Sequence, residues 1–285
     1  MEMLLAIETA TSVCSAALLK DGEVLAEDSV IADRRHNETL PDMVLGLYER
    51  TSLKPADTGL VAISIGPGSF TGLRVGLSFA KGWALATGAQ IIPVGTLEAL
   101  AQSLITNYEL RITNSQRIRQ PSAVSNRKSV IIIPLTVARK GEAFAQKCEM
   151  RNGNCEMVGE PFLCDRQALE EKLGSLAQTV SESGISNQKS AIIFGGEGAD
   201  MLWQGNRFLP SSLENSNSRI QYIPGLQPAA GTVGTLAWRI YRSGAKLPAM
   251  SDLQPLYLKE FTIGQVQTTN REFPARQPKA NSQQP

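Results

Sequence analysis

The sequence predicts an α/β protein built from two related halves. Three strand patterns open the chain and are followed by alternating helix and strand patterns, and the second part of the chain repeats this order less completely. The chain has 285 residues, of which 42% are hydrophobic, so it is long enough to bury a substantial core.

Three strands and a helix are expected at the start of the chain. Apolar runs predict the strands, and Asp21-Gly22 is typical of the turn of a hairpin. In the helix, Pro41 falls in the first turn, where a proline is tolerated. Met43 lies beside the inward stripe, so the helix is apolar over more than one side. The strands cover 3–8, 13–20 and 23–30, and the helix covers 37–51 with an inward stripe of Leu40, Val44, Leu47 and Tyr48.

A glycine-rich stretch at 66–88 follows the next expected strand, at 60–65. Ser69 and Thr71 are residue types that begin helices, and a helical pattern runs to about Ala86. Small residues recur at every fourth position of this helix and form a stripe almost free of side chains. Because each glycine in a helix costs about 1 kcal/mol relative to alanine, we expect another backbone to approach there. It could belong to the chain's own sheet, to a neighbouring helix or to a partner protein. The stripe consists of Gly72, Gly76, Ala80, Ala84 and Gly88.

The order of the elements indicates the fold. A strand at 91–94 and a helix from Thr96 to about Leu104 complete the first half. Three strands followed by alternating helices and strands form the half-unit of ribonuclease H-like and actin-like ATPase folds, whereas a plain Rossmann unit alternates from its start. The second half is expected to have strands at 130–138, 142–150, 156–162 and 191–194 and helices at 166–180 and 229–243.

Composition suggests where the halves begin and end. The segment 106–128 is polar without an apolar period, which predicts a linker or long loop. The segment 265–285 is polar and punctuated by proline, which predicts a flexible tail. We therefore expect an N-terminal half at 1–105, joined by the late helix 229–243, and a C-terminal half at 129–264.

Charge and cysteine usage exclude several classes of protein. Lys and Arg (28) nearly balance Asp and Glu (27), so no general affinity for polyanions is expected. The longest apolar run is too short for a bilayer, and no signal peptide is evident, so we expect a cytoplasmic protein without a membrane segment. The cysteines have no zinc-ligand spacing. Cys148 and Cys155 could face each other across a turn, although reduced thiols are expected in the cytoplasm.

The motifs of common catalytic sites do not fit this sequence. The spacing Gly66-x-Gly68-x-x-x-Gly72 is one residue too long for a dinucleotide-binding turn, and no phosphate-binding loop of the GxxxxGK[ST] type is present. His36 is the only histidine, which excludes metal sites with several histidines. Its position before a helix favours a capping or surface role.

An actin-like nucleotide site is the better alternative. It would use Glu8, Thr9 and Thr11 after the first strand and Gly195 and Gly196 late in the chain. The turn after the first strand lacks the glycine that would let a phosphate approach closely, which argues against ATP hydrolysis. An ATPase or small-molecule kinase with a degenerate nucleotide site therefore remains the alternative function.

The glycine-rich stretch resembles the bacterial TsaB (YeaZ) family, whose members are partner subunits in the synthesis of threonylcarbamoyladenosine on tRNA. The resemblance rests on GPGSFTGLRVG at 66–76 and AKG at 80–82. It is supported by LAIETAT at 5–11, HNETLP at 36–41 and VGTLEALA at 94–101, and more weakly by ARKGE at 138–142 and PLYLK at 255–259. Val137 departs from the family, which usually has aspartate there.

The resemblance implies an actin-like fold and a non-catalytic subunit. The related catalytic subunit, TsaD, carries a metal-binding His-x-x-x-His where this chain has Thr96 and Leu100, so no catalytic residue, metal site or cofactor of its own is expected. ATP and metal are expected on partner subunits. The implied partners are TsaD, the ATPase TsaE and, functionally, TsaC, with tRNA contacted only indirectly; the chain could form a homodimer when alone.

The resemblance also implies where the partner docks. Members of the family bind it through two helices, here 37–51 and 72–87, which favours the partner as the reason for the small-residue stripe. The expected function is to dock TsaD and activate it for the formation of threonylcarbamoyladenosine next to the anticodon of tRNA. The expected interface residues are Leu40, Met43, Leu47, Gly72, Leu73, Gly76 and Ala80.

Overall fold

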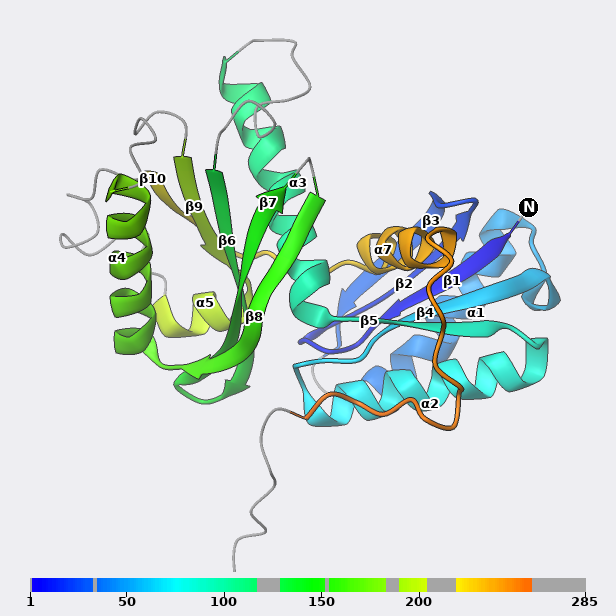
Figure 1. Cartoon of the computed structure of the whole chain (residues 1–285). Helices are drawn as coiled ribbons and strands as arrows, with labels where there is room; N and C mark the ends of the chain where they lie inside the picture. Colours follow the sequence, from blue (N-terminus) through cyan, green and yellow to red (C-terminus); the bar gives the residue numbers. More distant parts are fainter. Residues whose placement is uncertain are drawn as a thin grey trace, which may run out of the picture.

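Two five-stranded sheets, each covered by helices on both faces, form the two halves of the molecule (Figure 1). The computed structural model describes residues 2–32, 35–116, 129–151, 154–182, 190–203 and 219–257.

The first sheet has the strand order β3-β2-β1-β4-β5. The first three strands form an antiparallel meander, and β4 and β5 then add in parallel beside β1. Side chains alternate between the two faces along each strand. In β1, Leu5 and Ile7 therefore pack under one layer of helices, and Leu4 and Ala6 pack under the other. The strands are β1 (Met3–Glu8), β2 (Val13–Lys20), β3 (Glu23–Ile31), β4 (Thr58–Ser64) and β5 (Gln90–Val94).

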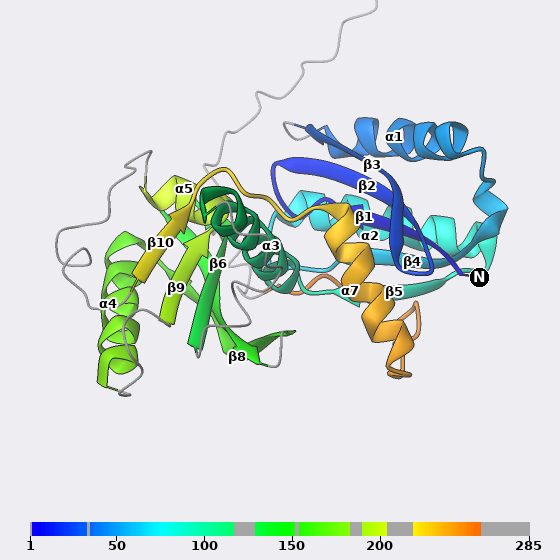
Figure 2. The same cartoon turned by 90° about the horizontal axis from the view of Figure 1, so that it is seen from above.

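Helices α1 (His36–Thr51) and α2 (Phe70–Thr87) cover one face of this sheet, and α7 (Ala230–Arg242) covers the other (Figure 2). A short 3-10 helix, η1 (Pro55–Asp57), leads into β4. The expected helix at 37–51 and its inward residues are confirmed, since Leu40, Val44, Leu47 and Tyr48 are all buried.

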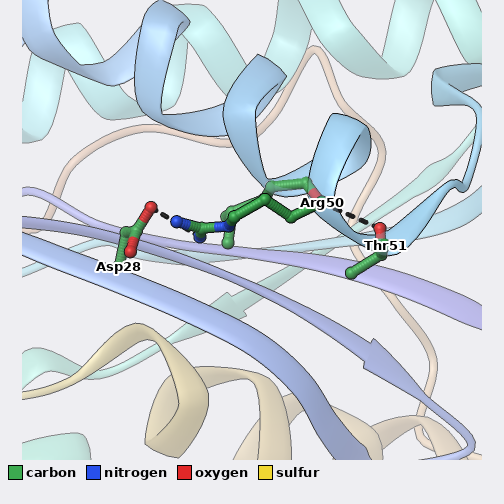
Figure 3. A network of polar contacts seen from close by, with 4 residues as sticks. Asp28, Arg50 and Thr51 are labelled. Atoms are coloured by element: carbon green, nitrogen blue, oxygen red, sulfur yellow. Dashed lines mark hydrogen bonds and ion pairs between the residues drawn. The ribbon is translucent and has the colours of Figure 1, made fainter.

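The end of α1 is tied to the edge strand β3 (Figure 3). Arg50 forms an ion pair with Asp28 at 2.6 Å, and the hydroxyl of Thr51 donates to the carbonyl oxygen of Leu47 at 2.8 Å. The Arg50 and Asp28 side chains are 54% and 37% exposed. Exposed pairs of this kind contribute about 0–1 kcal/mol, so packing rather than this ion pair holds α1 on the sheet.

The second sheet repeats the arrangement of the first, with the order β8-β7-β6-β9-β10. Its first three strands are antiparallel neighbours, and β9 and β10 add in parallel. This repeat confirms the predicted actin-like fold with two related halves. The strands are β6 (Ser129–Arg139), β7 (Glu142–Arg151), β8 (Asn154–Cys164), β9 (Ser190–Gly195) and β10 (Arg219–Ile223), and the helices on one face are α4 (Arg166–Glu182) and α5 (Glu197–Trp203).

The helix α3 (Thr96–Gln116) follows the first sheet but covers the free face of the second, and α7 follows the second sheet but covers the first. The prediction that α3 ends near Leu104 and that a linker begins at 106 is wrong for residues 106–116, which continue the helix. Ile105 and Tyr108 are buried against the second sheet, and this packing extends the helix. Residues 117–128 and 265–285 of the expected linker and tail lie outside the described residues.

The hairpin of β7 and β8 carries the two cysteines whose state the sequence left open. Cys148 and Cys155 form a disulfide, with their Cα atoms 6.0 Å apart, whereas we expected reduced thiols. Cys14 and Cys164 are free and buried.

Candidate protein–protein interface and the cleft between the halves

A groove of about 390 Å³ runs between the exposed faces of α1 and α2. The two helices lie on the same face of the first sheet, so the groove opens away from the core. The sequence builds α2 locally: Ser69 caps it by accepting the N–H of Gly72 at 3.2 Å, and Gly88 ends it in the left-handed conformation. The groove is lined by Asn37, Leu40 and Pro41 from α1 and by Arg74, Val75, Ser78 and Phe79 from α2.

One cation is held at this groove. The guanidinium carbon of Arg74 lies 3.7 Å from the centre of the Phe70 ring, and its Nε donates to the hydroxyl of Tyr257 at 3.0 Å. The rings of Phe70 and Tyr257 pack with their centres 5.2 Å apart. Stacking on an aromatic ring is favourable for a guanidinium and fixes its direction. Arg74 is exposed and thus available to a partner.

The segment after α7, drawn in orange in Figure 1, runs beside α2 and carries Tyr257. Lys81 donates its Nζ to the carbonyl oxygen of Leu253 at 2.9 Å, and the N–H of Leu256 donates to the carbonyl oxygen of Ile65 at 2.7 Å. Leu253 is buried in the core beneath α2. These contacts hold the end of the described chain beside the groove.

The small-residue stripe of α2 faces inward from Gly72 to Ala84, whereas Gly88, which ends the helix, is exposed. A Cβ atom at Gly72 would collide with the carbonyl oxygen of Thr9, and one at Gly76 would collide with the hydroxyl of Thr9. That hydroxyl donates to the carbonyl oxygen of Gly72 at 2.9 Å, and the N–H of Ser69 donates to the carbonyl oxygen of Ala10 at 2.7 Å. The backbone that approaches the stripe therefore belongs to the chain's own turn between β1 and β2.

The expected interface residues are corrected accordingly. All of them except Met43 are buried in the chain's own core, because the apolar and small positions of α1 and α2 pack onto the first sheet and its turn. Only Leu40 also lines the groove. Sequence reasoning missed the other groove residues. Their one signal in the sequence is a spacing of four residues beside the small-residue stripe, which separates Arg74 from Ser78 and Val75 from Phe79. The six buried residues are Leu40, Leu47, Gly72, Leu73, Gly76 and Ala80.

The residues considered for a nucleotide site lie at the ends of β1 and β9. Glu8 is fully buried and accepts the N–H of Ala10 at 2.6 Å and the hydroxyl of Ser64. Burial raises the pKa of Glu8 from 4.5 to about 7, and the nearby negative charge of Glu197 acts in the same direction. Thr9 and Thr11 are buried beside it.

The glycine pair at the end of β9 packs against α3. Cβ atoms at Gly195 and Gly196 would collide with the side chains of Leu104 and Leu100. These glycines therefore admit a helix of the same chain, and Leu100 and Leu104 are themselves buried.

His36 lies inside the protein rather than at its surface. Its Nε2 is 3.1 Å from the carbonyl oxygen of Thr11, to which it can only donate. This bond ties the first residue of α1 to the turn after β1. Among the described residues, no group of three or more His, Cys, Asp or Glu side chains is arranged to hold a metal ion. Thr96 is buried and its hydroxyl accepts the N–H of Gly66 at 3.1 Å. Within the described ranges, no helix combines the length and apolar character needed to traverse a bilayer.

Comparison with known proteins finds similarity to proteins of tRNA threonylcarbamoyladenosine synthesis. A family model described as "TsaD: tRNA N6-adenosine threonylcarbamoyltransferase" matches residues 29–117. The tRNA threonylcarbamoyladenosine biosynthesis protein TsaB of Escherichia coli is 39% identical over 99 residues, which are 35% of this chain and 42% of that protein. TsaB of Bacillus subtilis is 27% identical over 155 residues, which are 54% of this chain and 58% of that protein. The sequence matches thus span between 42% and 58% of the length of these two curated relatives.

The similarity of the fold is more extensive. The structure of YeaZ from Pseudomonas aeruginosa covers 90% of this chain and all of that protein with a TM-score of 0.61, at 21% sequence identity. The chain is therefore similar in sequence to TsaB of Escherichia coli over 99 residues and similar in fold to YeaZ over 90% of its length.

Proposed function

We propose that this chain is a non-catalytic subunit that binds a threonylcarbamoyltransferase of the TsaD type through the groove between α1 and α2. Docking there would activate the enzyme for threonylcarbamoyladenosine formation next to the anticodon of tRNA. The observation that carries the proposal is the groove itself: it lies within the part of the chain that resembles TsaB, and it combines apolar walls with one fixed cation.

The chemistry of the groove suits a protein partner. Val75, Phe79 and Pro41 are only partly buried, so a partner that covers them removes apolar surface from water. Arg74 is already oriented by Phe70 and Tyr257, so binding a carboxylate there would order few additional side chains. A partner segment with an acidic residue next to apolar ones fits both features.

The same proposal assigns the binding of ATP, metal and tRNA to other components. ATP and metal would be bound by the partner subunits TsaD and TsaE, TsaC would supply the activated adenylate, and tRNA would contact this chain only indirectly. When the partner is absent, the same groove could hold a second copy of this chain.

A substitution at the rim of the groove tests the proposal. Ser78 is exposed and lines the groove, so Ser78→Trp fills the groove without disturbing the core. We expect this variant to lose TsaD in co-purification and to lower tRNA modification in a reconstituted reaction. Ser175→Trp is the matched control, because Ser175 is exposed on α4 in the other half. Co-purification of Ser78→Trp with TsaD at the yield of the control would contradict the proposal.

A further inference from the structure

The turn between β1 and β2 is fastened to the second half of the molecule by one carboxylate. Glu197, the first residue of α5, accepts both the N–H and the hydroxyl of Ser12, each at 2.9 Å through the same oxygen atom. The two residues are 185 positions apart in the chain. A second hydrogen bond also joins the halves, because the hydroxyl of Thr136 in β6 donates to the carbonyl oxygen of Pro67 at 3.4 Å.

Three N–H groups in and just after this turn have acceptors within the chain. Ala10 donates to Glu8, Ser12 donates to Glu197, and Val13 donates to the hydroxyl of Thr11 at 3.3 Å. The N–H and the hydroxyl of Ser12 converge on one oxygen of Glu197, and two donors that converge in this way favour a negative charge at that point. Here the negative charge on the open side comes from Glu197, because Ser12 is exposed whereas Glu8 is fully buried.

We propose that Glu197 is an internal anion, whose carboxylate occupies the anion position of the β1–β2 turn, excludes an external anion such as a phosphate group, and fastens the two halves together. Glu197 is well placed for this role because its helix begins beside β6: a Cβ atom at Gly198 would touch the carbonyl oxygen of Thr136. The inference does not depend on the proposed docking of TsaD, since neither Ser12 nor Glu197 lines the groove.

Hydrogen exchange of the full-length chain tests whether Glu197 holds the β1–β2 turn through Ser12. In Glu197→Ala, the amide of Ser12 should exchange at least about tenfold faster than in the wild type, the factor expected when one hydrogen bond to a charged group is lost. Glu160→Ala is the matched control, because Glu160 is an exposed glutamate of the second half, and it should leave this rate unchanged. Glu197→Gln keeps the size of the side chain and should show a smaller increase. Equal exchange of the Ser12 amide in the wild type and in a folded Glu197→Ala variant would overturn the proposed role of Glu197.

Inorganic phosphate tests the anion position. At millimolar concentration it should restore slow exchange of the Ser12 amide in Glu197→Ala and have no effect on the wild type. Failure to restore protection in the variant would overturn the anion position. Protection of the turn by magnesium ATP in the wild-type chain would overturn the exclusion, because the phosphates would need the donors that Glu197 already holds.

Discussion

Replacing Glu8 with glutamine is expected to remove a pH-dependent loss of stability. Glu8 is fully buried, and burial raises its pKa from 4.5 to about 7. Glutamine resembles the protonated acid in shape, so its amide oxygen can still accept the N–H of Ala10 and its NH₂ group can face the hydroxyl of Ser64. The variant therefore keeps the packing of the neutral side chain and loses only its titration.

The direction in which the free energy of unfolding changes with pH follows from proton binding to Glu8. Between pH 4.5 and 7 the folded chain holds a proton on Glu8 that the unfolded chain has released, so the free energy of unfolding falls as pH rises through this window. Each pKa unit corresponds to about 1.4 kcal/mol, so a rise of about 2.5 units (7 − 4.5) corresponds to about 3 kcal/mol. Below pH 4.5 both states bind the proton, and above pH 7 both have released it.

Urea unfolding of both proteins at pH 4.5 and pH 8 measures the effect. The difference in unfolding free energy between Glu8→Gln and wild type should change by about 3 kcal/mol in favour of the variant between these pH values. Groups common to both proteins cancel in this difference. Glu160→Gln, at an exposed position, is the matched control and should follow the wild type. Parallel curves for Glu8→Gln and wild type would refute the buried, protonated state of Glu8.

Further predictions concern the glycines of α2, the ion pair of Arg50 and the contact between Tyr257 and Arg74. Gly76→Ala should destabilise the chain by about 1–3 kcal/mol in chemical unfolding, because the new methyl group meets the hydroxyl of Thr9; Gly82→Ala, in the same helix with no atom near its Cβ position, should stabilise it by up to about 1 kcal/mol. Arg50→Ala should lower the unfolding free energy by about 1 kcal/mol or less, and by less still in high salt. Tyr257→Ala should weaken TsaD binding in titration calorimetry without changing the melting temperature by more than about 4 °C, because it removes the contact that orients the groove's cation.

Local signals account for how much of the fold could be predicted. The hairpin turn at Asp21-Gly22 and the apolar runs around it set the first meander, and the strand order follows from the alternation after it. The end of α3 could not be predicted in the same way. Leu104, Ile105 and Tyr108 continue its buried side into a polar segment, and the sheet that buries them is built from residues further along the chain.

The site shows why small residues are informative only in part. The stripe at Gly72 and Gly76 correctly predicts close approach of another backbone, but the approaching residue is Thr9, more than sixty positions earlier, and a partner protein would have produced the same pattern. Gly195 and Gly196 likewise predict close approach, and there the approaching groups are the carbonyl oxygens of two neighbouring strands and leucine side chains of helix α3. A glycine therefore shows that something must come near and leaves its identity to the tertiary structure. Glu197 lies next to that pair, and because a single carboxylate has no local pattern, its bond to a serine 185 residues away becomes visible only once the chain is folded.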